Sequence, residues 1–198
     1  MKGRPRKFDI DKALDSAMLV FWRNGYEGAS ISELSAAMKI NRPSLYGTFG
    51  DKEQLFVRAL ERYLADYGTK GVAQLLEHPN ITDAIAAFFN CVVEQLTNSQ
   101  LPSGCLITNC TVECGERFAE IGRRLNQCHA ETEAALYNRL QQAQAKGQIS
   151  EAEDVRALAQ FFTTAMLGMA VMARNNSNPV VIQQLAKTAM RILPSNSD

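Results

Sequence analysis

The sequence has no surplus of charge of either sign, because its 198 residues contain 21 Lys and Arg and 21 Asp and Glu. It lacks an apolar run approaching the ~18 residues that a membrane-spanning helix needs. The opening stretch MKGRPRKFD lacks the apolar core of a signal peptide. We therefore expect a cytoplasmic protein with no membrane partner. Its five cysteines should then be reduced thiols that form no disulfide framework.

No stretch shows the alternation of a β-strand and no segment is repeated, so we predict an all-α protein. A hydrophobic content of 46% over 198 residues is enough for a sizeable core, as one domain or two small ones. The chain has only two histidines and no CxxC or HxxxH spacing. A metal site would have to combine Cys110, Cys114, Cys128 and His129 without such spacing. We therefore expect neither a metal nor another cofactor.

The charges are divided unevenly along the chain. Residues 1–50 hold eight Lys or Arg and five Asp or Glu, a net charge of +3, and the remaining residues carry −3. A basic head on an acidic body is typical of a nucleic-acid-binding module attached to a part that binds no nucleic acid. This distribution predicts that the N-terminal part makes the nucleic-acid contacts.

Three helix starts lie within residues 25–55. Each begins with a side chain that can cap the first turn, followed by a Glu or Gln three residues later or by a proline in that turn. The second helix must be short, because Gly47 and Gly50 lie in it and after it. Two short helices joined by a tight turn are the shape of a helix-turn-helix. The three starts are Ser30 with Glu33, Asn41 with Pro43, and Asp51 with Gln54.

These residues resemble the DNA-binding domain of the TetR family of transcriptional repressors, over roughly the first third of the chain. The sequence departs from the family at Met38-Lys39, where the family often has a small residue followed by glycine. A lysine can adopt the left-handed conformation of such a turn at modest cost. The matching positions are Gly25-Tyr26, Ser30-Ile31, Leu34, Ala36-Ala37, Leu45-Tyr46, Phe49, Asp51-Lys52-Glu53 and Leu55.

The resemblance implies an architecture and a function. It implies a three-helix helix-turn-helix domain over residues 1–50, a connecting helix over residues 51–71, and a helical effector-binding and dimerisation domain over residues 72–198. It further implies a homodimeric transcriptional regulator rather than an enzyme. We expect a repressor that a small molecule or a thiol modification releases from double-stranded operator DNA.

The expected DNA contacts gather on the recognition helix, residues 42–48, and around it. Arg42 and Ser44 lie in the first turn, where such helices read base edges, and Arg42 could bond a guanine bidentately. Leu45 and Phe49 face the opposite way and are expected in the core. The basic N-terminal arm and nearby hydroxyls suit phosphates, and Lys52 lies at a helix start that could meet one. The predicted contacts are Lys2, Arg4, Arg6, Ser30, Ser32, Arg42, Pro43, Ser44, Tyr46, Gly47, Thr48 and Lys52.

Apolar spacing and capping residues predict the remaining helices. The first runs from about Asp9 to Asn24, and its Trp22 is expected to pack against the helix that starts at Asp51. That helix should end near Gly68 or Gly71. The later helices are expected to start at Asn80, Cys105, Glu116, Ser150 and Asn178, the last of them ending at Leu193.

The cysteines allow two interpretations. Free cysteines are often small hydrophobes in a core, and we expect this of Cys91 and Cys128. The alternative for the others is a thiol sensor, since Cys105 follows a Pro-Ser-Gly turn at a helix start, where the helix dipole lowers the pKa of a thiol. The segment PSGCLITN also resembles a TetR subgroup with a PxGC segment, some of whose members respond to electrophiles or oxidants through a cysteine near this position. The candidate effector or thiol-sensing residues are Cys105, Cys110 and Cys114.

The last two helices are the best candidates for a four-helix dimer interface. Ala165 and Gly168 would permit close approach of two helices. Methionines of the same helix could line a ligand cavity instead, because they adapt to varied shapes. The expected interface residues are Ala165, Gly168, Met169, Met172, Val181 and Leu185.

Two other functions compete with a ligand-released repressor. One is a DNA-binding protein without an inducer. The other is an all-α thiol enzyme with Cys105 or Cys110 as nucleophile and His129 as base. The enzyme would leave the basic arm unexplained, and no carboxylate pattern orients the histidine.

Overall fold

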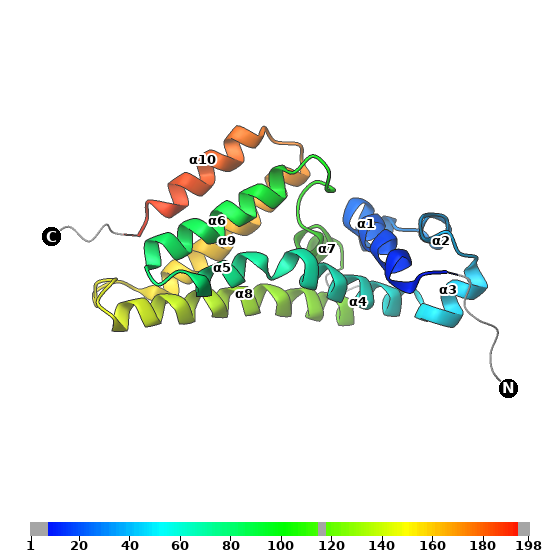
Figure 1. The fold of residues 1–198 in the computed structure, drawn as a ribbon, viewed down its shortest axis with the longest axis horizontal. Coiled ribbons are helices and arrows are strands. Elements are labelled where there is room, and N and C mark those ends of the chain that lie inside the picture. Colours follow the sequence, from blue (N-terminus) through cyan, green and yellow to red (C-terminus); the bar gives the residue numbers. More distant parts are fainter. Residues whose placement is uncertain (1–7, 115–117, 194–198) are drawn as a thin grey trace.

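The computed structural model describes residues 8–114 and 118–193. Every regular element in these two ranges is a helix, which confirms the all-α prediction (Figure 1). In chain order the elements are α1 (Ile10–Gly28), α2 (Ile31–Met38), α3 (Arg42–Phe49), α4 (Lys52–Tyr63), the π-helical segment η1 (Leu64–Gly68), α5 (Lys70–Glu77), α6 (Ile81–Thr97), α7 (Leu106–Cys114), α8 (Ala119–Ala145), α9 (Val155–Arg174) and α10 (Pro179–Met190).

The three helix starts predicted within residues 25–55 are confirmed. Ser30 Oγ accepts the backbone N–H of Glu33 at 3.1 Å, and the Glu33 carboxylate accepts the Ser30 N–H at 3.1 Å. Asp51 and Gln54 form the same reciprocal pair at 2.9 and 3.2 Å. Asn41 Oδ1 accepts an N–H from the first turn of α3 at 2.8 Å. Each cap satisfies an N–H that its helix leaves unpaired, so the short helices α2 and α3 start at defined residues.

The tight turn between α2 and α3 passes through Lys39. This residue is in the left-handed conformation, with φ 55° and ψ 39°, as expected from the sequence. Its N–H and that of Ile40 bond back to carbonyls of the last turn of α2, at 3.2 and 3.1 Å. The left-handed conformation costs an L-residue roughly 1–2 kcal/mol, and glycine escapes this cost.

Helix α1 is kinked at Gly25, where φ is 76° and ψ is 177°. The first helix was predicted to end before this residue, and the helical geometry does break at Gly25; a further helical stretch then runs to Gly28. A Cβ at Gly25 would collide with the carboxylate of Glu113 in α7. That carboxylate accepts the backbone N–H of Glu27 at 3.3 Å. The positive φ favours glycine at the kink, and a larger residue would also have to displace the Glu113 carboxylate from its bond to Glu27.

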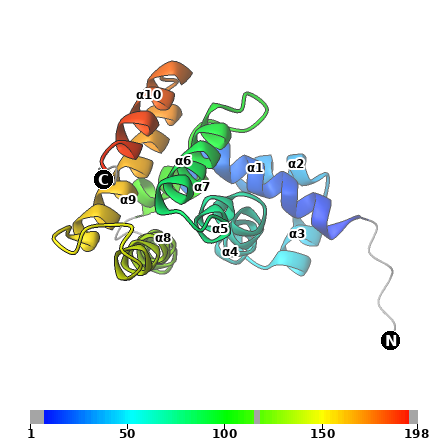
Figure 2. The same cartoon turned by 60° about the vertical axis from the view of Figure 1, so that its left-hand side comes forward.

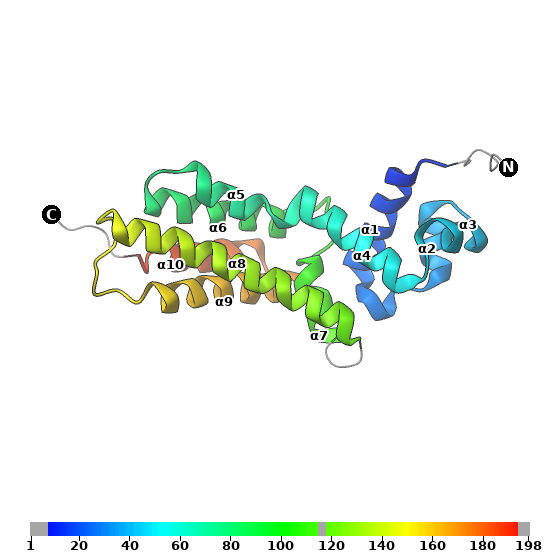
Figure 3. The ribbon, with the colours of Figure 1, turned by 90° about the horizontal axis from the view of Figure 1, so that it is seen from below.

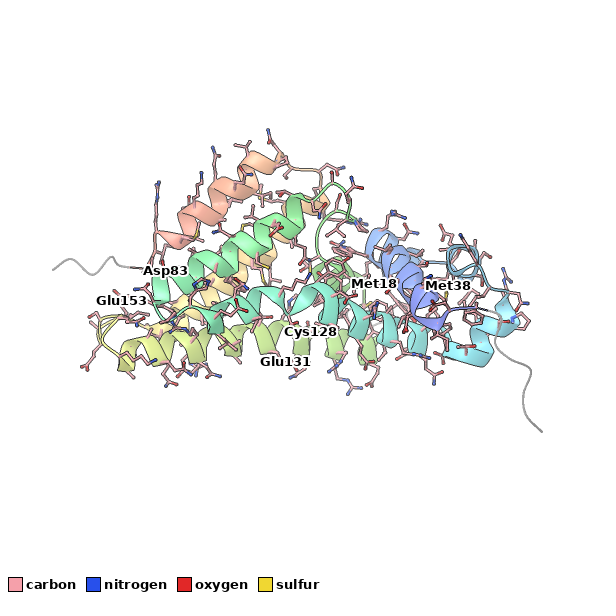
Figure 4. The ribbon with its side chains drawn as sticks, viewed as in Figure 1. Met18, Met38, Asp83, Cys128, Glu131 and Glu153 are labelled. Atoms are coloured by element: carbon pink, nitrogen blue, oxygen red, sulfur yellow. The ribbon has the colours of Figure 1, made fainter. Side chains whose placement is uncertain are left out.

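The helices form a head and a body that α4 connects. The head holds α1 to α3, and α4 runs from it through η1 into α5 (Figure 1). Seen from below, the long helix α8 passes between α5 and α9 (Figure 3). Helix α10 packs against α6 and α9 and covers that side of the body (Figure 2). Met18 and Met38 mark the head, whereas Asp83 and Glu153 mark the far end of the body (Figure 4).

Two buried clusters stabilise this arrangement. The first joins α1 to α4 with α7 and the first half of α8, and the second joins α5, α6, α9, α10 and the second half of α8. Helix α7 therefore shares its core with the head, although it follows the connecting helix in sequence. The domain boundaries after residues 50 and 71 remain predictions.

Trp22 joins three elements within the first cluster. Its fully buried ring meets the Tyr63 ring edge-on, with 4.8 Å between centroids, which confirms the predicted packing against α4. Its Nε1 donates to the carbonyl of Gly104 at 3.1 Å. Its own carbonyl accepts a bond from Asn109 Nδ2 at 3.2 Å. These contacts tie α1 to the end of α4 and to the turn that precedes α7.

The connecting helix differs from its prediction. A single helix was expected to end near Gly68 or Gly71, but α4 ends at Tyr63, η1 follows, and α5 continues to Glu77. Leu75 of α5 is fully buried, and the packing of α5 on α6 sustains helix beyond the glycines. The buried guanidinium of Arg139 in α8 donates to the carbonyls of Leu75, His78 and Pro79, at 3.1, 2.9 and 2.9 Å. These bonds satisfy carbonyls that the end of α5 leaves free.

Two other helix ends also differ. The expected cap at Ser150 is wrong, because Asp154 caps α9 by accepting N–H groups of its first turn, both at 3.0 Å. Ser150 instead belongs to the loop, where its Oγ accepts the N–H of Ala152 at 3.3 Å. The last helix starts at Pro179 after its Asn178 cap, as predicted, but ends at Met190 rather than Leu193.

Lys39→Gly should stabilise the protein by about 0.5–1 kcal/mol, because glycine occupies the left-handed conformation without the clash of a Cβ. Thermal and urea unfolding of the full chain would measure the gain. Lys39→Ala keeps the Cβ and removes the same charge, so it is the control and should leave stability nearly unchanged. A destabilised glycine variant would show that the turn carries no such strain.

Candidate DNA interface and effector pocket

Helix α3 lies at the end of the head that is away from the body (Figure 1). Arg42, Pro43 and Gly47 are exposed, and the Tyr46 side chain is 49% exposed, although a tyrosine ring is usually more covered. Ser44 and Thr48 are half-buried beside them. Leu45 and Phe49 are buried beneath, as predicted. The sequence thus divides α3 into a polar outer face and an apolar inner face.

Arg42 and Ser32 come together across the turn. The Arg42 guanidinium donates to Ser32 Oγ, so two predicted DNA contacts lie side by side on α3 and α2. Ser30 is engaged differently, since its hydroxyl donates to the Glu33 carboxylate at 2.9 Å as part of the cap. Ser30 therefore serves mainly as a cap in this state, whereas Arg42 and Ser32 keep an exposed position.

Lys52, which was predicted to meet a phosphate, contacts the end of α1 in this structure. Its Nζ donates to the carbonyl of Glu27 at 3.3 Å and lies 4.7 Å from the centroid of the Tyr26 ring. Burial lowers its pKa, and the nearby carboxylates of Glu27 and Glu113 oppose this shift. A DNA phosphate would have to compete with these intramolecular contacts. The arm residues Lys2, Arg4 and Arg6 lie outside the described residues.

Arg58 supports α3 from behind, and no sequence pattern indicated it. Its Nη1 donates to the carbonyl of Thr48 at 3.1 Å, and its guanidinium lies 4.8 Å from the centroid of the Phe49 ring. A cation at the end of a helix interacts favourably with the free carbonyls there. Arg58 thus fixes the end of the recognition helix relative to α4. Only the three-dimensional packing of α4 on α3 brings these groups together.

The body contains a cavity of about 70 Å³ among α4 to α9. Aromatic rings from α4, η1 and α6 form one wall, and residues from α7, α8 and α9 close the other. The turn before α7 supplies Cys105, and the side chains of Gln95 and His129 also reach the cavity. Its principal lining residues are Tyr63, Tyr67, Phe88, Gln95, Cys105 and Met166.

The cysteines separate into two groups. Cys105 and Cys91 line the cavity and are half-buried, so the expectation of a buried Cys91 is wrong. Cys110, Cys114 and Cys128 are buried in the first cluster. Burial raises the pKa of Cys114 to about 11 and that of Cys110 and Cys128 above the usual value. These three thiols are therefore protonated packing residues near neutral pH.

The histidine and the thiols form no catalytic pair. His129 Nε2 lies 3.1 Å from Thr111 Oγ1, while the Cys105 sulfur accepts a bond from the Tyr63 hydroxyl at 3.2 Å. Within residues 8–114 and 118–193, no three His, Cys, Asp or Glu side chains gather as metal ligands. The contacts of His129 thus give no support to a thiol enzyme.

An apolar face runs along α9 and α10. Phe161 and Val171 of α9 are 40% and 44% exposed, and Leu185 of α10 is 40% exposed. Gly168 is exposed on the same helix, with open space where a Cβ would lie. Met169 is buried within its own protomer, so its assignment to an exposed interface is wrong. The other expected interface residues, Ala165, Met172 and Val181, are half-buried or exposed.

Helix α9 is also apolar enough to be considered as a membrane-spanning helix. Among the described helices it alone has the length and mean hydropathy, 1.4 over its most apolar stretch, that a membrane span needs. This corrects the expectation that no segment approaches such a span. Helix α9 packs against α6, α7, α8 and α10, and core helices pass the same test. Packing within the protomer buries 39% of this stretch, and exposed Phe161 and Val171 belong to the apolar face described above.

Comparisons with known proteins agree with this geometry. The family described as bacterial regulatory proteins, tetR family, matches residues 13–59, and the tetracyclin repressor-like C-terminal domain matches residues 82–189. The transcriptional repressor ComR of Escherichia coli K12 is 37% identical over 98% of this chain and 92% of its own length. The uncharacterised regulator YezE of Bacillus subtilis is 30% identical over 96% of this chain and 99% of its own length.

A solved structure extends the similarity to a protein–DNA complex. A cysteine mutant of the TetR family regulator CifR, in complex with 26-bp double-strand operator DNA, superposes with a TM-score of 0.92. It is 33% identical to this chain, and the match covers 97% of this chain and 100% of that one. Sequence, fold and the exposed face of α3 thus agree. The chain belongs to the TetR family of DNA-binding transcriptional regulators.

Proposed function

We propose that the protein is a homodimeric repressor whose two copies of α3 read an operator, and which leaves the DNA when its cavity is occupied or Cys105 is modified. One observation carries this proposal: Tyr63 both lines the cavity and ends α4, the helix that connects the cavity to the head. The operator complex of CifR and the repressor function of ComR support the DNA-binding part. A repressor of this kind would act in the cytoplasm.

Release requires that the effector bind one conformation better than another. A ligand with equal affinity for both would shift no population, however tightly it bound. In this proposal the differential affinity comes from Tyr63 and Tyr67, whose rings lie 4.8 and 5.2 Å from the Trp22 ring in α1. A ligand that displaces either tyrosine changes the packing of α1 on α4. The spacing of the two recognition helices in a dimer depends on that packing.

A thiol modification would act at the same place. Cys105 lies in the PxGC segment, and its sulfur accepts the Tyr63 hydroxyl at 3.2 Å. A group attached to this sulfur would enter the cavity and displace the tyrosine. Cys105 is therefore the proposed sensing thiol of this chain, while Cys110 and Cys114 contribute to the core. Membership of the PxGC subgroup is part of this proposal.

The exposed apolar face of α9 and α10 supports the dimer. Partly exposed Phe161, Val171 and Leu185 are large side chains that a partner's copy of the same face would cover. A two-fold interface uses the same patch on both subunits, and small residues such as Gly168 permit helices to approach closely. This arrangement would bury four helices together, as in a four-helix bundle.

Arg42→Ala is expected to weaken binding to an operator selected from random DNA by about 1–3 kcal/mol and to relax base preference at one position. The reason is its exposed place in the first turn of α3. Fluorescence anisotropy with the operator and its single-base variants would measure both effects. Lys146→Ala at the end of α8 removes the same charge from an exposed position in the body and should change neither. Unaltered affinity and preference in the Arg42 variant would show that α3 does not read bases.

Gly168→Glu is expected to convert a dimer into a monomer and to weaken operator binding at least tenfold. A side chain at this position meets open space within the protomer, so the protomer itself should remain folded. Sedimentation velocity at micromolar concentration would report assembly, and circular dichroism would report folding. Gln142→Glu on the exposed side of α8 adds the same charge and serves as the control. Wild-type protein that sediments as a monomer would refute the interface.

Iodoacetamide is expected to label Cys105 faster than the four other cysteines. Burial raises the pKa of each of those four thiols and so lowers their thiolate fraction. The Cys105 thiolate displaces iodide, forming an S–C bond after its proton passes to the buffer. Labelling should release the protein from its operator, whereas Cys105→Ser should stay bound under the same treatment. Peptide mass spectrometry over time decides this, and labelling of Cys105 no faster than that of the other four cysteines would leave it a packing residue.

A further inference from the structure

We infer that the cavity selects small uncharged molecules bearing one hydrogen-bonding group, and that Gln95 is the residue that recognises this group. The inference rests on the proposed role of the cavity as effector site and adds its ligand class. It follows from three properties of the described lining: its charge, its polar groups and its size.

The lining offers no counter-charge for an ion. Among the described lining residues there is no Lys, Arg, Asp or Glu. Tyr63 is wholly buried and its pKa lies well above the usual value because of that burial, so it stays neutral. Burial lowers the pKa of His129, so its imidazole is also neutral near pH 7. An anion or a cation would lose its hydration without gaining a partner charge, which costs far more than burying a neutral polar group.

Gln95 keeps spare hydrogen-bonding capacity at the Tyr63 end of the cavity, and its amide is a stronger hydrogen-bonding group than the neighbouring Cys105 thiol. The Tyr63 hydroxyl accepts a bond from Gln95 Nε2 at 2.7 Å and gives its single proton to the Cys105 sulfur. The hydroxyl of Thr132 donates to the carbonyl of Cys128 at 3.1 Å. Gln95 uses one N–H for Tyr63 and retains a second N–H and a carbonyl oxygen. Its amide can therefore donate to, or accept from, a hydroxyl, carbonyl or amide of a ligand.

The rest of the cavity sets the shape and size of the ligand. Phe88, Tyr67, Val92 and Met166 provide apolar walls, and methionine adapts to ligands of different outline. A volume of about 70 Å³ is a few times that of a single water-sized probe, so the ligand has on the order of ten heavy atoms or fewer. A compact aromatic or aliphatic body with one polar group fits this space. Benzyl alcohol has these properties and is a suitable probe.

Trp22 provides a built-in reporter of occupancy. It is the only tryptophan, and its ring contacts Tyr63 and Tyr67, which both line the cavity. Ligand entry should change its fluorescence in the full-length protein without DNA. Titrations with benzyl alcohol, benzoate and benzylammonium at pH 7 compare three molecules of nearly the same size. Benzyl alcohol is expected to bind at least tenfold more tightly than either ion, and an ion that binds equally well, or no response to benzyl alcohol, would overturn the inference.

Substitutions at Gln95 identify the recognising group. Gln95→Leu should reduce the preference for benzyl alcohol over toluene roughly two- to tenfold, the value of one hydrogen bond. Gln95→Glu places a carboxylate in the cavity and should raise affinity for benzylammonium above that for benzyl alcohol. Thr108→Val removes another lining hydroxyl and is the control. Loss of the preference in the Thr108 variant but not in Gln95→Leu would overturn the role of Gln95.

Thermal unfolding of each variant verifies that its fold is retained, and Gln95→Leu remains informative if the charged variant unfolds. The binding titration is independent of the repressor function. Operator release by benzyl alcohol, measured separately by anisotropy, tests that function. Selective binding of benzyl alcohol without release would uphold the ligand class and contradict its use as an effector site.

Discussion

The contact between Trp22 and Tyr63 is the interaction on which the rest of the structure depends. Trp22 belongs to α1 of the head, and Tyr63 is the last residue of α4 before the π-helical segment. The indole also donates to Gly104, so the same ring joins the turn that leads to α7. Both rings are fully buried, and such aromatic pairs contribute about 0.5–1.5 kcal/mol beyond the burial of their surface. Head, connecting helix and cavity therefore meet at one small cluster.

Local chemistry was enough to predict the head. The caps at Ser30, Asn41 and Asp51 act over three residues, so the sequence alone identifies them. The left-handed Lys39 also follows from local conformational preference. The sequence was less decisive before α9, where Ser150 and Asp154 can both cap a helix, and the structure has Asp154 as the cap. The chain remains helical through the glycines of η1 and α5. This depends on the packing of α5 on α6, which no local sequence pattern shows.

In the candidate sites, too, local sequence predicts some features, and only the three-dimensional fold shows the others. The polar face of α3 was predictable because alternation around one short helix separates Arg42 from Leu45 and Phe49. The partners of Lys52 and Arg58 come from residues distant in sequence, so the partial burial of Lys52 could not be foreseen. The cavity draws residues from six helices, and only the fold shows that Cys105 lies beside Tyr63 while Cys110 lies in the core. Cysteines that are close in sequence thus lie in two different environments, the cavity and the buried core.

The close packing of the first cluster limits how a signal can travel from the cavity to the head. Protein cores are nearly as dense as organic crystals, so an added ligand or thiol substituent must displace lining side chains rather than compress them. Tyr63 and Tyr67 contact Trp22 directly, whereas Met166 and Phe88 face the second cluster. Displacement of the two tyrosines would therefore change the packing of α1 on α4. In the proposed mechanism, the polar end of the cavity is therefore where a ligand would acquire the differential affinity that control of DNA binding requires.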